Sequence, residues 1–209
     1  MAMRWMMLLW MSLLLLGGLA NTLEDRWTVE PFSDSLPGKT VTVPRKIWME
    51  GALTGEEQEG PMRPETVFAL RCLQTALPGE TLTLELEAEY AAAVTVPDQE
   101  TGGWVAENAW QYGLIVEGET EENGQRLHLR YVGPVHAAAM RALGLNRTEY
   151  LIFLRRMGQA VLKRNGRAVA WIYRVSAGEA VSFALPEEAA WEISGDSADW
   201  VIIAVRSGS

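Results

Sequence analysis

Two histidines and one cysteine are the side chains here whose types most often carry nucleophilic or acid–base chemistry. They are His128, His136 and Cys72. An enzyme that uses a Cys–His pair needs the two side chains within hydrogen-bond reach, and nothing in the spacing of these residues predicts such a pair. Cys72 lies in an apolar run, which is typical of a small buried side chain. The sequence therefore predicts no catalytic residue and favours a protein that is not an enzyme.

Patterns that bind metal ions are missing as well. The sequence contains no His-Glu-x-x-His, no pair of Cys-x-x-Cys and no EF-hand loop. Acidic residues do cluster near a predicted hairpin tip, at Glu117, Glu119, Glu121 and Glu122. Their oxygens could bind Ca²⁺, but a solvated acidic turn is the simpler interpretation. We expect no metal and no cofactor.

The distribution of charge suggests a binding surface. The chain has a net charge of −9, which argues against nucleic-acid binding. Residues 141–174, however, contain eight basic residues and Glu149 as the one acidic residue. The alternative is that these basic side chains point into water and pair with acidic neighbours. The candidate binding residues in this segment are Arg155, Arg156, Lys163, Arg164 and Arg167.

A second candidate group is aromatic. Trp104, Trp110 and Tyr112 lie in or beside a predicted loop, where aromatic rings can stack on a sugar or a peptide. The alternative is that these rings pack against the core.

The elements that would position these residues are mostly predicted strands. Residues 81–87 alternate between leucines and polar residues, which indicates a half-buried strand. Asn165-Gly166 predicts a tight hairpin turn between strands at 160–164 and 167–175. Pro134 and Gly144 bound one helix, at 134–143. For 149–156 we prefer a buried strand, although Asn146 and Glu149 could form a capping box for a helix. Further strands are predicted at 40–43, 47–54, 66–75, 91–96, 113–118, 125–132, 180–185, 190–193 and 200–205.

The first 20 residues have the pattern of a cleavable signal peptide. Arg4 precedes an uncharged run from Trp5 to Leu16, and Gly18 and Ala20 occupy the positions that signal peptidase prefers. The alternative is an uncleaved membrane anchor. We expect an exported protein, periplasmic or extracellular, with no stable membrane span after cleavage. An extended lead-in (21–46) then precedes a single β domain (47–209) that contains an insertion at about 88–132.

Three stretches resemble exported bacterial domains of the netrin-like type, the fold of the tissue inhibitors of metalloproteases. They are Trp48–Leu53, Thr66–Leu70 leading into Leu77–Leu84, and Glu149–Leu154. The resemblance implies an OB-like (oligonucleotide/oligosaccharide-binding) barrel, here with a long insertion and extra C-terminal strands. The chain lacks the N-terminal cysteine through which those inhibitors act. A β-sandwich is the alternative fold.

These observations favour an exported, non-catalytic binding or assembly module of the cell envelope, with a protein or a glycan as its partner. The netrin-like resemblance leaves a secreted protease inhibitor as one alternative. The other is an enzyme with unrecognised catalytic residues, for which His128 and His136 are the obvious acid–base candidates.

Overall fold

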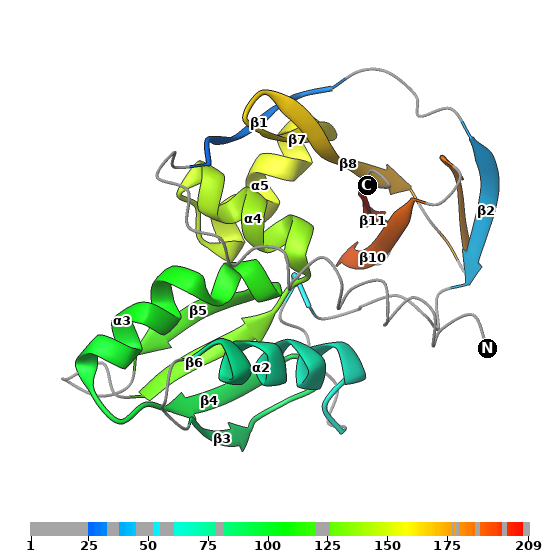
Figure 1. The fold of residues 1–209 in the computed structure, drawn as a ribbon. Coiled ribbons are helices and arrows are strands. Elements are labelled where there is room, and N and C mark those ends of the chain that lie inside the picture. Colours follow the sequence, from blue (N-terminus) through cyan, green and yellow to red (C-terminus); the bar gives the residue numbers. More distant parts are fainter. Residues whose placement is uncertain are drawn as a thin grey trace.

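The computed structural model describes residues 25–32, 38–44, 52–54, 61–77, 82–119, 126–176, 178, 180–186, 189–197 and 200–206. Within these residues the strands form three antiparallel sheets, with helices packed against them (Figure 1). The helices are α2 (Pro64–Ala76), α3 (Gln99–Asn108), the 3₁₀ helix η2 (Ala109–Tyr112), α4 (Pro134–Leu143) and α5 (Arg147–Met157). The strands are β1 (Trp27–Pro31), β2 (Lys39–Pro44), β3 (Thr83–Leu86), β4 (Ala91–Thr95), β5 (Leu114–Glu119), β6 (Arg126–Tyr131), β7 (Gln159–Arg164), β8 (Arg167–Ser176), β9 (Ala180–Leu185), β10 (Ala190–Ser197) and β11 (Trp200–Arg206).

One part of the molecule is a four-stranded sheet with the strand order β3-β4-β6-β5, in the lower half of Figure 1. One face of this sheet is apolar. Val94 of β4 and Leu127 and Leu129 of β6 belong to a buried cluster shared with α2, α3 and η2. Because side chains alternate between the two faces of a sheet, the residues between these positions point to the opposite face.

The other part is built on a five-stranded sheet with the order β1-β7-β8-β11-β10. One face of it, including Ile172 and Ile202, packs in a cluster with α4 and α5. The other face, including Ile203 and Val205, packs against the two-stranded sheet of β2 and β9. Helix α4 contacts η2 and β5 of the first part and β1 and β11 of the second, so it links the two.

The predictions that depended on strong local signals are confirmed. Helix α4 begins at Pro134 and is followed by Gly144 in the left-handed conformation, as expected for a C-terminal stop. The hairpin of β7 and β8 turns at Asn165 and Gly166, whose φ angles of 52° and 78° are those that a tight Asn-Gly turn requires. The hairpin of β5 and β6 also lies where it was predicted.

Two predicted strands are helices instead. Residues 66–75 lie in α2, where Thr66, Ala69, Leu70 and Leu73 are buried at the spacing of one helix face. Residues 149–156 lie in α5, which begins with the capping box that the sequence left open. Short apolar runs of this kind fit a buried strand as well as a helix, so periodicity alone gave the wrong element.

The β-rich fold class is confirmed, but an OB-like barrel is not, since the described strands form open sheets and several helices accompany them. A two-sheet sandwich does not describe this arrangement either. The segment predicted as an insertion, 88–132, supplies three of the four strands in the order β3-β4-β6-β5. The predicted lead-in supplies β1 and β2. Residues 47–51 of the predicted strand 47–54 lie outside the described residues, and 52–54 form a turn.

The predicted signal peptide, residues 1–20, lies outside the described residues. In the described part of the chain, no helix has the length and apolar character needed to cross a membrane. Export therefore stays a prediction from the sequence.

Candidate functional site

The face of the four-stranded sheet that points away from α2 and α3 carries most of the polar side chains of that sheet, and we call it the polar face. Strand β6 contributes Arg126, His128 and Arg130 to it, because these residues alternate with buried Leu127 and Leu129. Charged residues of β3 and β5, and Glu87 directly after β3, contact all three, as described below.

Two pairs of side chains cross over β4, from strand β6 to Glu85 of β3 and to Glu87, which directly follows β3. Arg126 Nη2 donates a hydrogen bond to Glu85 at 2.5 Å, and His128 Nδ1 lies 2.9 Å from Glu87. Strands β3 and β6 lie on either side of β4, so each pair spans two strand spacings, about 9.6 Å. The residue of β4 in register with His128 is Ala93, which is 1% exposed. Its small side chain lets the long side chains cross above it.

The Glu87–His128 pair has the form of an oriented base. A carboxylate bound to one ring nitrogen fixes the imidazole and leaves the other nitrogen available for proton transfer. His128 Nε2 is shielded from solvent and forms no hydrogen bond with the part of the chain that the structure describes. The carboxylate–imidazole pair is therefore the arrangement in the described residues that is best suited to acid–base chemistry.

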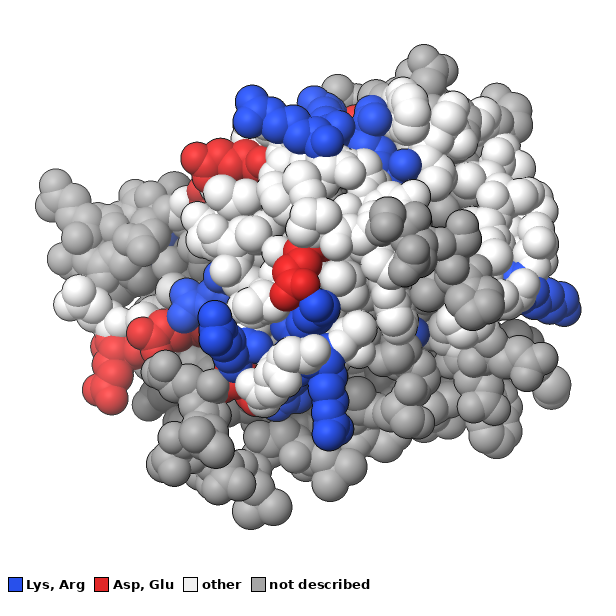
Figure 2. Space-filling model, turned by 90° about the horizontal axis from the view of Figure 1, so that it is seen from above, with Lys and Arg blue, Asp and Glu red and all other residues white. Residues whose placement is uncertain are grey.

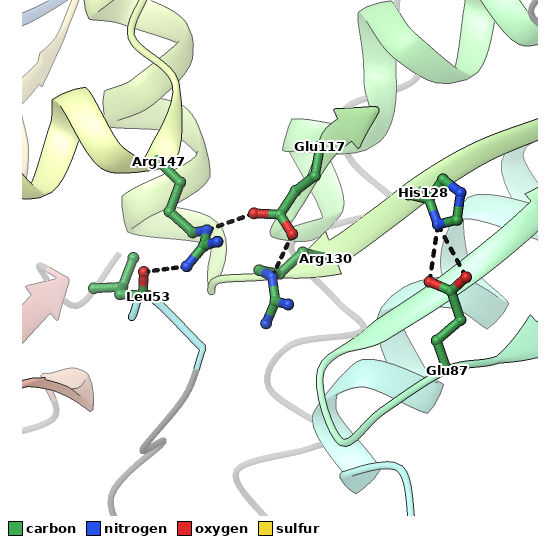
Figure 3. A network of polar contacts seen from close by, with 6 residues as sticks. All are labelled: Leu53, Glu87, Glu117, His128, Arg130 and Arg147. Carbon is green, nitrogen blue, oxygen red and sulfur yellow. Dashed lines mark hydrogen bonds and ion pairs between the residues drawn. The ribbon is translucent and has the colours of Figure 1, made fainter. Parts of the chain in front are cut away.

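A second ion-pair network ties the polar face to α5 (Figure 3). Glu117 of β5 accepts hydrogen bonds from Arg130, at 2.6 Å, and from Arg147. Arg147 also donates to the carbonyl oxygen of Leu53 at 2.8 Å. Arg130 is 8% exposed, and a buried guanidinium is stable only when it is paired. This network holds the polar face and the first turn of α5 in a fixed relation.

A metal-bound water is another common source of a catalytic nucleophile, and a catalytic zinc ion takes three protein ligands, usually His and carboxylate side chains. The full sequence has two histidines and one cysteine. His136 is buried elsewhere, and Ala93 occupies the position of β4 next to His128. Among the residues that the structure describes, no group of three His, Cys, Asp or Glu side chains could hold a metal ion. This donor set does not fit such a zinc centre.

The other candidate acid–base residue, His136, lies in the core, where its surroundings indicate a structural role. It is fully buried in α4, and its Nδ1 lies 3.0 Å from the hydroxyl oxygen of Tyr150. Burial lowers the pKa of His136 to about 3, so the ring is neutral. Cys72 is a free cysteine on α2, and burial raises the pKa of its thiol. Neither residue belongs to the polar face.

The predicted basic binding residues lie around α5, β7 and β8, and several of them are paired with acidic residues. Arg155 donates to Asp196 at 2.8 Å, Lys163 pairs with Glu30, and Arg164 pairs with Asp25. The hydrogen bond from Arg164 lowers the pKa of Asp25.

Figure 2 shows the basic side chains in separate groups with acidic ones beside them. Arg156 and Arg167 are exposed and form no ion pair with a described residue. The structure thus agrees with the alternative of paired, solvated charges for three of the five residues. Binding of an envelope protein or glycan there stays a prediction.

The predicted aromatic group does not lie in a loop. Trp104 belongs to α3, and Trp110 and Tyr112 belong to η2. Trp104 and Tyr112 are partly buried against the core of the four-stranded sheet. Trp110 packs edge-on against Trp27, with ring centroids 5.7 Å apart. These rings join η2 and α3 to the rest of the fold, and their side chains are only partly available to a ligand.

Comparison with known proteins shows similarity to proteins whose names refer to D-alanyl-D-alanine. No family model matches the chain. Over 114 residues it is 33% identical to a D-alanyl-D-alanine carboxypeptidase of Enterococcus faecium. This match covers 52% of the chain and 37% of the relative, so the chain spans little more than a third of that relative's length.

The fold is similar to that of a crystal structure of the vancomycin resistance D,D-dipeptidase VanXYg in complex with a D-Ala-D-Ala phosphinate analog. The TM-score is 0.62 and the sequence identity is 14%, over 81% of this chain and 99% of the other. At this level of identity the similarity shows a shared fold.

These findings overturn two predictions. The netrin-like resemblance is wrong, because the similar proteins are D-Ala-D-Ala peptidases and two of the stretches that carried it, Thr66–Leu70 and Glu149–Leu154, are helical. The predicted non-catalytic binding or assembly module is wrong for the same reason, since the similar proteins are enzymes. A protease inhibitor depended on the netrin-like resemblance alone. The alternative of an enzyme with unrecognised residues fits in part.

In the sequence, His128 and Arg130 alternate with Leu127, Leu129 and Tyr131 in a predicted strand, which predicts a position on its polar side, and the structure confirms this position. Glu85, Glu87 and Glu117 were not predicted as partners. Glu87 is 41 residues away from His128 in the chain, and only the pairing of β3, β4 and β6 brings the two together. No local pattern signals such a contact.

Proposed function

We propose that this chain is a peptidase that acts on peptides ending in D-alanyl-D-alanine. The observation that carries the proposal is the 33% identity, over 114 residues, to a D-alanyl-D-alanine carboxypeptidase. The fold shared with a D,D-dipeptidase supports it. The substrate class is taken from the names of these proteins.

The polar face supplies a group for the reaction. His128 Nε2 would accept a proton from a water molecule as the water oxygen attacks the carbonyl carbon of the peptide bond. The protonated ring would then donate a proton to the departing amine nitrogen as the C–N bond breaks, which releases D-alanine. Glu87 would orient the ring and stabilise its charged form, as a carboxylate does for a catalytic histidine.

The test is the release of D-alanine from a peptide with a D-Ala-D-Ala end, with the L-Ala-L-Ala peptide as the stereochemical control. We expect release from the D,D peptide alone. His128→Ala should lower the rate at least about 100-fold, the usual contribution of a general base. Glu87→Gln should lower it about 10-fold, because the ring loses its orienting partner.

Arg71→Ala serves as the matched control, because Arg71 is exposed on α2, on the far side of the sheet from His128. It should leave the rate unchanged. The absence of D-alanine release by the unmodified protein would contradict the proposed function. Release that persists in His128→Ala would contradict the assignment of the base.

A further inference from the structure

The tip of the hairpin of β7 and β8 binds the residues that lead into β1. Asn165 contacts them through three of its atoms. Its backbone N–H donates to the Arg26 carbonyl at 2.8 Å, its Oδ1 accepts from the Arg26 N–H at 2.9 Å, and its Nδ2 donates to Asp25 at 2.9 Å. Arg164 pairs with the same Asp25 carboxylate. The hairpin tip is thus the docking point of residues 25 and 26.

Asn165 and Gly166 also form a dipeptide that is chemically labile. The backbone nitrogen of the glycine can lose its proton and attack the side-chain carbonyl carbon of the asparagine, so that ammonia leaves and a cyclic succinimide forms. Water then opens the ring to aspartate or isoaspartate. Glycine favours the attack, because no Cβ shields its nitrogen. Both residues are exposed, and nothing lies within 4 Å of a Cβ added to Gly166, so water reaches this site.

The contacts with residues 25 and 26 oppose this reaction. The attack requires a mobile side-chain amide, and both the oxygen and the nitrogen of the Asn165 amide are bonded to those residues. The hydrogen bond from Arg164 lowers the pKa of Asp25, so this acceptor is ionised at neutral pH. A hydrogen bond to an ionised group is stronger than one between neutral groups. Asn165 therefore reacts chiefly while residues 25 and 26 are detached.

The product of the reaction cannot restore the contacts. Deamidation replaces the Nδ2 donor with a carboxylate oxygen that would face the Asp25 carboxylate at hydrogen-bond distance, where like charges repel. Isoaspartate also adds a methylene group to the backbone of the turn. The φ angles of 52° at Asn165 and 78° at Gly166 are those of a tight two-residue turn, which has no room for an added backbone atom.

From these contacts we infer that Asn165 is a modification site, at which deamidation makes the detachment of residues 25 and 26 irreversible. While these residues are docked, Asn165 persists. Once they detach, its conversion to an acidic residue prevents their return. Strand β1 lies at the edge of the five-stranded sheet, next to β7 (Figure 1), so it can leave without breaking the pairing of the other four strands. The inference does not depend on the proposed peptidase activity.

Mass spectrometry of a proteolytic digest tests the first half of the inference, after the folded full-length chain has been incubated at mildly alkaline pH. Asp25→Ala should raise the deamidation rate of Asn165 about 5-fold, the factor expected for the loss of one hydrogen bond. Glu30→Ala is the matched control, because it removes an ion pair with Lys163 between the same two strands and does not touch Asn165. It should leave the rate unchanged. Asn123-Gly124, the other Asn-Gly dipeptide of the sequence, is the internal reference, whose rate should be the same in all three proteins.

Equal rates at Asn165 in the unmodified chain and in Asp25→Ala would overturn the protection by residues 25 and 26. A rise at both Asn-Gly dipeptides would also overturn it, because it would indicate general unfolding.

Hydrogen exchange tests the second half of the inference. Asn165→Asp introduces the charge of the product without any incubation. The backbone amides of β1 should then exchange faster than in the unmodified chain, whereas those of β11 should keep their rates. Unchanged exchange in β1 would overturn the irreversible detachment, and equally faster exchange in both strands would replace it with a general loss of stability. Release of D-alanine by these variants bears on the proposed function alone.

Discussion

The shielded carboxyl group of Glu192 and the buried ring of His136 have opposite effects on how stability changes with pH. Burial raises the pKa of Glu192 to about 7, and this effect outweighs the charge of Arg206 and the hydrogen bond from the Val135 N–H, which both lower it. Burial lowers the pKa of His136 to about 3. Folding therefore favours the protonated form of Glu192 and the neutral form of His136. Between about pH 4.5 and pH 6.5 the first effect weakens the fold as pH rises, and the second strengthens it.

Glu192→Gln should remove the effect of Glu192 on the pH dependence of stability and leave that of His136. The folded protein holds a proton on Glu192 between its unfolded pKa of 4.5 and its folded pKa of about 7, so the contribution of the carboxyl group is lost as pH rises through that window. The free energy of unfolding of the unmodified protein, relative to Glu192→Gln, should fall by at most about 3 kcal/mol from pH 4.5 to pH 7.5. Urea unfolding at several pH values measures it. A difference that does not change with pH would contradict the account.

The start of α4 depends on a glycine that faces the same carboxylate. Gly133 has a φ of +88°, and a Cβ atom built on it would lie 2.5 Å from both oxygens of Glu192. Glu192 accepts a hydrogen bond from the Val135 N–H, which is otherwise without a partner in the first turn of a helix. A carboxylate from β10 thus caps α4, and the close approach requires glycine.

Gly133→Ala should therefore destabilise the fold more than Gly144→Ala. Gly144, at the other end of α4, has a φ of +64° and nothing within 4 Å of an added Cβ. Its replacement should cost about 1 kcal/mol, the usual penalty for a left-handed alanine. Gly133→Ala adds the displacement of the Glu192 cap and should cost at least about 2 kcal/mol. Equal midpoints of urea unfolding for the two variants would contradict this view of the α4 start.

Elements with explicit terminal signals could be predicted from the sequence, and elements defined by tertiary packing could not. Pro134 and Gly144 fixed α4, and Asn165-Gly166 fixed the hairpin of β7 and β8. Strand β3 was predicted as half-buried, yet Leu84 and Leu86 are 38% and 64% exposed. The reason is that β3 lies at the edge of its sheet, and strand order is not contained in a local pattern.

The candidate site was predictable to a similar degree. The alternation of Leu127 and Leu129 with His128 in the sequence predicts that the His128 side chain points away from the apolar face, as it does in the structure. The contacts of His128 with Glu87 and of Arg126 with Glu85 require the register of three strands. The basic residues of 141–174 predicted a binding surface because they are close in sequence. Their acidic partners Asp25, Glu30 and Asp196 come from distant segments.

On the scale of the whole molecule, the polar face and the basic residues belong to different parts. The polar face lies on the four-stranded sheet, whereas Lys163, Arg164 and Arg167 lie on the hairpin of the five-stranded sheet (Figure 1). The first contains His128 in contact with Glu87 and Arg126 paired with Glu85. The second offers charges that are largely paired with acidic neighbours. A D-alanyl peptide that binds to the polar face and one that binds to the hairpin would therefore affect different residues.

The most direct test is a titration of the ¹⁵N-labelled protein with D-Ala-D-Ala, followed by the shifts of its backbone amide signals. The account predicts that the largest shifts fall in β3, β4 and β6, at 83–86, 91–95 and 126–130, and that they saturate. Shifts centred on the hairpin at 159–176 would place binding on the basic residues and contradict the assignment of the polar face. An unchanged spectrum at high ligand concentration would contradict the proposal that this chain acts on D-alanyl-D-alanine peptides.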